Sequence, residues 1–321
     1  MIGYYVHHHG HGHLHRALSL AQQLDEPVVG LSSRPPPADA PFADWVQLAP
    51  DDAFEGAADL HAGGALHWAP INSPGYERRM HQLARWVAQD APRLVVVDVS
   101  VEVAALIRLL GTPTVVVTLP GGRADDPHTT AYRLAAAIVA PWPGEVYDPP
   151  HLTAHAGKVV FTGAFSRFDG KPAGPVTGDK RALLLLGSGG TDVPVATGRS
   201  AGWQWSTLGG AGRWSDDVWT ALQDADVVVT HAGLNALAEV AAARRPAIVV
   251  PQGRPFDEQR TTGDALRSAG LATVLDAWPA AGDWPGLLDA AAAQGQQWTR
   301  WNDGRGAARF ARVVTEVAHG G

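Results

Sequence analysis

Short runs of consecutive apolar residues recur along this chain, and glycine-rich or polar loops and then helix-like stretches follow them. The clearest runs cover residues 94–97 and 227–230, and both consist mainly of β-branched valine. A strand that is apolar at every position is buried on both faces, which is typical of a parallel sheet covered by helices. The chain is therefore predicted to be an α/β protein with parallel strands.

The strand–loop–helix plan opens each half of the chain. In the first half, a strand over residues 1–6 is followed by a loop over 7–13 and a helix over 14–24; in the second half, a strand over 183–186 runs into a glycine-rich turn. Residues 169–178, rich in glycine and proline, are typical of a linker. A length of 321 residues also suits two domains. We therefore predict two Rossmann-like domains that face each other across a cleft.

Composition excludes several classes of protein. Hydrophobic residues make up 45% and charged residues 18%, which excludes a disordered or coiled-coil chain. The chain has no cysteine, so disulfides and thiolate zinc sites are excluded. A formal net charge of -7 argues against a nucleic-acid partner. No apolar run reaches about 18 residues and no signal peptide is present, so we expect a cytoplasmic protein, with a peripheral position at the inner face of the membrane as an alternative.

The loop after the first strand is unusually rich in histidine. Ligands of open α/β sheets bind beyond the carboxyl ends of the strands, where this loop lies. Four interpretations are considered: an expression tag, which the glycine interruptions and the position between a strand and a helix disfavour, a metal site, a solvated polar loop, and an active-site loop in which a neutral histidine acts as general base near pH 7. We favour the active-site loop, because its glycines let a substrate approach the backbone closely. The six histidines among residues 7–15 are His7, His8, His9, His11, His13 and His15.

The glycine-rich turn of the second half reads Gly187-Ser-Gly-Gly190. Backbone N–H groups and a helix N-terminus at such a turn bind phosphate, which makes Ser188 and Gly189 candidate phosphate ligands. A tight turn without a ligand would have the same composition. Neither loop contains the Gly-Lys-Ser/Thr of a P-loop or a Gly-x-Gly-x-x-Gly pattern.

Polar residues with helical spacing follow the next buried strand. His231, Asn235 and Glu239 are four residues apart, so we expect them on one face of a helix that begins near His231. The helix N-terminus with His231 and Asn235 can hold a pyrophosphate, and the Glu239 carboxylate can accept both hydroxyls of a ribose. Glu258 and Gln259, in a later loop, could bind sugar hydroxyls. The alternative is a solvated helix start with Glu239 as a surface acid.

Residues 180–275 resemble the donor domain of GT-B glycosyltransferases, closest to glycosyltransferase family 28 and the UDP-glycosyltransferases. The matching pattern is His-x-Gly-x-Asn-(x)3-Glu, then proline, then an acidic residue before glutamine. The resemblance implies that Glu239 binds ribose and that Glu258 and Gln259 bind the sugar, although many members have aspartate where this chain has Glu258. The residues implied to hold the donor phosphate are Gly12, Ser188, Gly189, His231, Gly233 and Asn235.

The first half resembles the same enzymes more loosely. Gly10-His-Gly-His13 with Arg16 is similar to the family loop that carries the catalytic base, which implies His13 as that base. Asp98, at the end of a strand, is implied to be its partner, and an N-cap of the following helix is the alternative role for Asp98. The resemblance thus implies GT-B architecture: a domain for acceptor and base over residues 1–164, a donor domain over 165–321, and a terminal helix, about 305–318, that packs back on the first domain.

The implied reaction is an inverting, metal-independent transfer of a sugar from a nucleotide-diphosphate donor, expected to be a UDP-sugar, to an acceptor hydroxyl. No metal and no cofactor are implied besides the donor as co-substrate. The acceptor is lipid-linked or a small molecule, and residues 68–76 and 120–123 are expected to make room for it. The first loop also resembles that of the UDP-sugar hydrolase of the pseudaminic acid pathway, in which the histidine activates water. A non-catalytic nucleotide-sugar binder is the third alternative.

Overall fold

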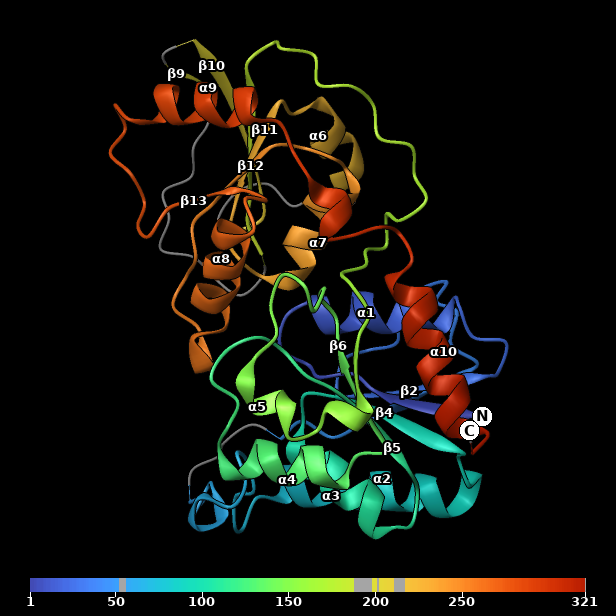
Figure 1. Cartoon of the computed structure of the whole chain (residues 1–321). Helices are drawn as coiled ribbons and strands as arrows, with labels where there is room; N and C mark the ends of the chain where they lie inside the picture. Colours follow the sequence, from blue (N-terminus) through green and yellow to red (C-terminus); the bar gives the residue numbers. More distant parts are fainter. Residues whose placement is uncertain (52–55, 188–197, 201, 211–216, 321) are drawn as a thin grey trace.

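The computed structural model describes residues 1–51, 56–187, 198–200, 202–210 and 217–320. It contains two β-sheets, each with helices packed against it, and Figure 1 shows the sheet of the first half below that of the second. The chain passes from one sheet to the other after residue 161 and returns near its end, where the last helix lies beside the first sheet. The predicted α/β class with two largely parallel sheets is confirmed.

The first sheet has seven parallel strands in the order β3-β2-β1-β4-β5-β6-β7. Side chains alternate between its faces, so Tyr4 packs against helices α1 and α10, whereas Tyr5 packs in the other core, with α2 and α3. The strands are β1 (Ile2–Tyr5), β2 (Val28–Ser32), β3 (Asp44–Gln47), β4 (Leu94–Asp98), β5 (Thr114–Val117), β6 (Ala137–Ala140) and β7 (Val159–Phe161). The helices of this half are α1 (Gly12–Ala21), α2 (Pro74–Asp90), α3 (Val101–Leu109), α4 (Asp126–Leu134), α5 (Pro150–Thr153) and the single turns η1 (Ala62–Gly64) and η2 (Ala156–Lys158).

The second sheet has six strands in the order β13-β12-β11-β8-β10-β9, and only β9 runs antiparallel to its neighbour. Its strands are β8 (Arg181–Leu185), β9 (Gly198–Ser200), β10 (Trp203–Leu208), β11 (Val227–Thr230), β12 (Ala247–Val249) and β13 (Thr273–Val274). The helices are α6 (Val218–Asp224), α7 (Leu234–Ala242), α8 (Glu258–Ser268), α9 (Trp284–Gln294), α10 (Gly306–Ala318) and the single turns η3 (Pro255–Asp257) and η4 (Trp298–Arg300).

Strand β10 is absent from the sequence prediction. Its residues alternate between buried and exposed positions, unlike the fully apolar runs that mark the central strands. Trp203 and Trp205 point inward, and the Trp205 ring meets the Trp284 ring of α9 edge-on at 5.2 Å between centroids. The two tryptophans therefore belong to the core of the second half.

Helix α10 belongs to the second half in sequence but packs on the first sheet. Phe310 and Val314 are fully buried in the core between α10, α1 and the β1 and β4 strands. Figure 1 shows α10 beside α1, with the two chain ends close together. In the described part of the chain, no helix combines the length and the apolar character that crossing a bilayer requires.

Replacing Phe310 with alanine should lower the free energy of unfolding by about 3–5 kcal/mol, because it leaves a cavity between α10 and the first sheet. Urea unfolding followed by circular dichroism measures the change. Leu109→Ala is the control, since the Leu109 side chain is 84% exposed and should change stability by under about 1 kcal/mol. Equal effects of the two substitutions would show that α10 contributes little to holding the fold.

Candidate active site

Two cavities meet between the halves of the molecule. The larger cavity has a volume of about 1520 Å³ and is lined mainly by the first half, with residues 254–256, 258 and 259 of the second. The smaller cavity, of about 430 Å³, lies between the N-terminal part of α1 and the loops that follow β8, β11 and β12. Residues that line both cavities include His9, Gly10, His13, Leu119, Arg254, Glu258 and Gln259. His13 therefore stands at the boundary between the two spaces.

Asp98 organises this boundary from the carboxyl end of β4. Its carboxylate is fully buried and accepts hydrogen bonds from Arg16 Nη1 at 2.7 and 2.8 Å and from the Tyr4 hydroxyl at 3.3 Å. His13 Nδ1 lies 3.0 Å from Asp98 Oδ1. Burial alone would raise the pKa of Asp98, but the charge of Arg16, and then His13, outweighs it and holds the pKa at about 2.

An ionised Asp98 determines how His13 can act. The carboxylate favours a proton on Nδ1 of the imidazole, which leaves Nε2 as the basic nitrogen. The alternative role of Asp98, as an N-cap, is wrong: the N-cap of α3 is Ser100, whose side chain accepts a hydrogen bond from the Val103 N–H. The Asp98 carboxylate therefore caps no helix and contacts Arg16, Tyr4 and His13 instead.

His231 lies in the loop between β11 and α7, on the wall of the smaller cavity. The Gly233 N–H donates to His231 Nδ1 at 2.9 Å, so the proton of the neutral ring is on Nε2. Nε2 faces the turn after β8, where a Cβ on Gly187 would lie only 2.8 Å away. Burial, and then the charge of Arg254, lowers the pKa of His231 to about 4. The ring is thus a neutral hydrogen-bond donor aimed at the turn expected to hold phosphate.

Glu239 and Asn235 share one face of α7, in line with their spacing. The buried Glu239 carboxylate accepts hydrogen bonds from Arg167 Nε at 3.0 Å and from Asn235 Nδ2 at 3.3 Å. Burial raises the pKa of Glu239, and Arg167 and Asn235 oppose the rise. His231 is not on this face, contrary to the prediction, because the helix begins only at Leu234 and the residues before it turn away.

Helices α1 and α7 abut where the two halves meet. His15 Nδ1 lies 3.8 Å from Glu239 Oε1, and a Cβ on Gly12 would lie 3.4 Å from the Asn235 Cβ. Gly12, Gly233, Asn235 and Glu239 all line the smaller cavity, together with His231. Ser188 and Gly189 lie outside the described residues. The structure thus brings the described donor-site candidates together around one space.

Gln259 and Glu258 begin α8 and line both cavities. The Gln259 amide oxygen accepts hydrogen bonds from the Ala232 N–H at 3.2 Å and the Gln252 N–H at 3.0 Å. It therefore ties the loops after β11 and β12 together, and its NH₂ group is what it can offer a ligand. Glu258 accepts a hydrogen bond from Arg123 Nη2 of the first half at 3.2 Å.

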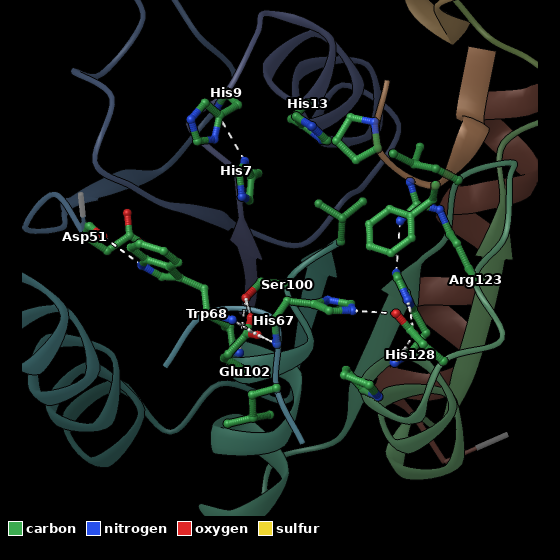
Figure 2. A pocket seen from close by; sticks show the side chains of 18 of the residues that line it. His7, His9, His13, Asp51, His67, Trp68, Ser100, Glu102, Arg123 and His128 are labelled. Atoms are coloured by element: carbon green, nitrogen blue, oxygen red, sulfur yellow. Dashed lines mark hydrogen bonds and ion pairs between the residues drawn. The ribbon is translucent and has the colours of Figure 1, made fainter. Parts of the chain in front are cut away.

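The wall of the larger cavity includes His67 and Glu102, whose roles the sequence did not indicate. Figure 2 shows His7, His9 and His13 along one side and Trp68, His67 and Glu102 along another. Glu102 Oε1 accepts hydrogen bonds from the N–H groups of His67 and Trp68 at 2.8 and 2.9 Å, which fixes this segment on α3. One sequence signal could have drawn attention to Glu102, which follows Ser100 by two residues. The Ser100 hydroxyl donates a hydrogen bond to Glu102 Oε2 at 3.0 Å.

Helix α2 faces the core and this cavity. Leu83, Trp86 and Val87 are buried, and Arg79 is 1% exposed. Arg79 Nη1 lies 2.9 Å from an Asp51 carboxylate oxygen and donates a hydrogen bond to the Tyr5 hydroxyl at 2.6 Å. Arg79 is therefore a buried, paired cation inside the first half.

The chain is similar to known proteins both in sequence and in structure. Residues 210–280 match the family model described as the glycosyltransferase family 28 C-terminal domain. No curated protein sequence matches the chain significantly. Solved structures match it over nearly its whole length. The glycotransferase of kitacinnamycin has a TM-score of 0.67 at 15% identity, with 98% of both chains covered.

Two further structures broaden the comparison. MurG of Acinetobacter baumannii has a TM-score of 0.62 at 15% identity, with 98% of this chain and 99% of that chain covered. A UDP-glucosyltransferase from Polygonum tinctorium, capable of glucosylating indoxyl, has a TM-score of 0.64 at 14% identity, with 98% of both chains covered. The fold is that of the GT-B glycosyltransferases, and residues 210–280 of the second half are similar to the family 28 C-terminal domain. The expected resemblance and the expected enzyme class, a glycosyltransferase, are confirmed by these matches.

Stability should fall in mild acid, because burial lowers the pKa of His15, His128 and His231 to about 4. The unfolded chain, with histidine pKa values near 6.5, binds more protons than the folded chain between about pH 6.5 and 4. The free energy of unfolding therefore decreases as the pH falls through this window. Thermal unfolding between pH 7.5 and 4.5 measures it, and His231→Gln should flatten the decrease, whereas substitution of the exposed His81 should not. A melting temperature that stays constant over this range would contradict the assignment of buried neutral histidines.

Proposed function

We propose that the protein transfers a sugar from a UDP-sugar to an acceptor hydroxyl with inversion of configuration. The nucleotide diphosphate would occupy the smaller cavity and the acceptor the larger one. The observation that carries the proposal is the position of His13, paired with Asp98, on the boundary between the two cavities. A general base at that boundary can take the proton of an acceptor hydroxyl in the larger cavity, beside the anomeric carbon of a donor in the smaller cavity.

The chemistry is a single displacement. His13 Nε2 takes the proton of the acceptor hydroxyl while its oxygen bonds to the anomeric carbon, and the bond from that carbon to the diphosphate oxygen breaks. Asp98 stabilises the imidazolium that forms, in the way that a buried carboxylate orients a catalytic histidine. The Nε2–H of His231 and the N-terminus of α7 stabilise the charge on the leaving diphosphate, so the step needs no metal ion.

The donor residues follow from the same arrangement. Glu239 would hold the ribose, and Glu258 and Gln259 the sugar. The nucleobase of the donor is proposed to be uracil, because the chain is similar in fold to a UDP-glucosyltransferase. The cytoplasmic location stays a prediction, as does peripheral contact with a membrane. The acceptor is predicted to be either lipid-linked or a small molecule.

The size of the larger cavity favours transfer over hydrolysis. A hydrolase needs room for one water molecule, whose share of liquid volume is about 30 Å³. The space beside His13 is about 1520 Å³ and has Trp68, Tyr76 and Leu119 in its walls. Aromatic and apolar walls of this kind suit an organic acceptor. The same feature disfavours a non-catalytic donor binder, which would need no acceptor space.

Glu239→Ala should weaken UDP binding by about 1–3 kcal/mol, because a charged hydrogen-bond partner of the ribose is lost. Isothermal titration calorimetry with UDP measures the change. Glu316→Ala on the exposed face of α10 is the matched control and should leave the affinity unchanged. Unchanged UDP affinity in folded Glu239→Ala would remove this residue from the donor site.

His13→Ala should lower the turnover number by about 10²- to 10⁴-fold, the usual contribution of a general base, with little effect on UDP affinity. The rate is measured as release of UDP from a donor with and without acceptor, and EDTA should leave it unchanged. Release of free sugar from the donor alone, as fast as any transfer, would overturn the transferase and support the hydrolase.

A further inference from the structure

A chain of hydrogen bonds crosses from the second half to the wall of the larger cavity. Glu258 Oε2 accepts from Arg123 Nη2 at 3.2 Å, and Arg123 Nη1 lies 2.9 Å from His128 Nε2. His128 Nδ1 lies 2.5 Å from one oxygen of Asp125, and His67 Nε2 lies 2.9 Å from the other. Figure 2 shows Arg123, His128 and His67 in this order along one side of the cavity. Five side chains thus connect the proposed sugar site with the acceptor space.

The direction of each hydrogen bond in this chain follows from its arginine. A guanidinium can only donate, so His128 Nε2 accepts and carries no proton. The proton of the neutral His128 ring is then on Nδ1 and is donated to Asp125. Burial, and then the charge of Arg123, lowers the pKa of His128 to about 4, which agrees with a neutral ring. The second Asp125 oxygen accepts from His67, so every bond in the chain has a defined donor.

The same chain lies beside a backbone contact between the two halves. The Gly122 N–H donates to the Phe256 carbonyl at 2.8 Å, and a Cβ on Gly121 would lie 2.2 Å from that oxygen. Phe256 and Asp257 both have positive φ, 60° and 53°, and the Arg123 guanidinium lies 4.8 Å from the centre of the Phe256 ring. The turn that precedes Glu258 is therefore held in a strained conformation by the loop that carries Arg123.

A metal ion is a poorer explanation of this cluster. His67, Asp125 and His128 each offer one ligand atom within 4.8 Å of the others. Both Asp125 oxygens, however, already accept hydrogen bonds from the imidazoles, and the Arg123 cation lies directly against His128. A divalent cation would have to displace the histidine protons next to that positive charge. Ordered hydrogen bonds satisfy the same groups without an ion.

We propose that Arg123 is a positioning residue for the donor sugar. It holds one carboxylate oxygen of Glu258, so that the other oxygen faces the sugar. Among the described residues, no other side chain bonds to the Glu258 carboxylate. The His128–Asp125–His67 chain holds Arg123 from behind, so the first half of the molecule shapes a subsite of the second. This proposal rests on the proposed function, and within it Glu258 binds the sugar.

The Arg123–Glu258 pair also determines which groups of a sugar this subsite can bind. An ionised carboxylate only accepts hydrogen bonds, so Glu258 Oε1 requires hydroxyl or amide N–H groups on the sugar. A donor with those hydroxyls should bind more tightly than UDP alone, and the gain should depend on Arg123. A deoxy-sugar without them should lose that gain.

The test compares UDP with UDP-glucose and UDP-N-acetylglucosamine by calorimetry. The reference ligand is the UDP-sugar of the two that the wild type binds more tightly. In Arg123→Gln, the affinity for this UDP-sugar should fall by at least about tenfold, while the affinity for UDP stays unchanged. Arg123→Lys should recover part of the loss, and Glu258→Gln should reproduce it. Arg85→Gln, an exposed arginine on α2, is the control, and thermal unfolding checks that each variant is folded.

Equal losses for UDP and the UDP-sugar in Arg123→Gln would show a merely structural role and overturn the proposal, as would no loss for either. Failure of the wild type to bind UDP at all would contradict the proposed function itself, which is a separate outcome read before any variant is compared. A raised KM for the donor with a smaller change in the turnover number would agree with positioning of the sugar.

Discussion

A buried negative charge at the end of β4 determines much of the arrangement at the candidate site. Moving the Asp98 carboxylate into the interior is costly unless cations and hydrogen-bond donors surround it. Arg16, Tyr4 and His13 meet that requirement, and two of them come from the first turns of α1. The charge therefore fixes α1 against the sheet and turns His13 toward the cavities. Stability and the proposed chemistry depend on the same contact.

The site is built jointly by the two halves. The start of α1 meets α7 at Asn235 and Glu239, and the loop after Leu119 meets the turn before α8 through Arg123 and Glu258. The first contact joins two helices, and the second joins a loop at the carboxyl end of one sheet with a helix start of the other half. Helix α10, which packs on the first sheet, adds a further connection. The relative position of the two cavities thus depends on specific polar contacts between the halves in addition to apolar packing.

Much of the fold could be predicted because buried parallel strands leave a distinct pattern. Strands β4 and β11 consist mainly of valine and are buried at every position, and both are central strands. Strand β10 lacks this pattern, because its residues alternate between buried and exposed positions. Helical spacing correctly placed Asn235 and Glu239 together but misplaced His231, because spacing does not reveal where a helix begins.

Contacts between distant loops could not be predicted from local patterns. Arg123 and Glu258 are 135 residues apart, and nothing in either segment indicates the other. The His67 and Asp125 pair likewise joins two loops that only the folded chain brings together. Asp125 does have a local signal, since it caps α4 ahead of Pro127, but a capping role says nothing of its second oxygen. Such pairs follow from tertiary structure alone.

We propose that a nucleotide diphosphate binds in the smaller cavity with its sugar directed at His13. A crystal structure with UDP bound tests this arrangement. We expect ribose hydroxyls within hydrogen-bond distance of the Glu239 carboxylate, a phosphate oxygen at His231 Nε2, and the terminal phosphate on the side of His13. Nucleotide density in the larger cavity, or with Glu239 and His231 both out of contact, would contradict it.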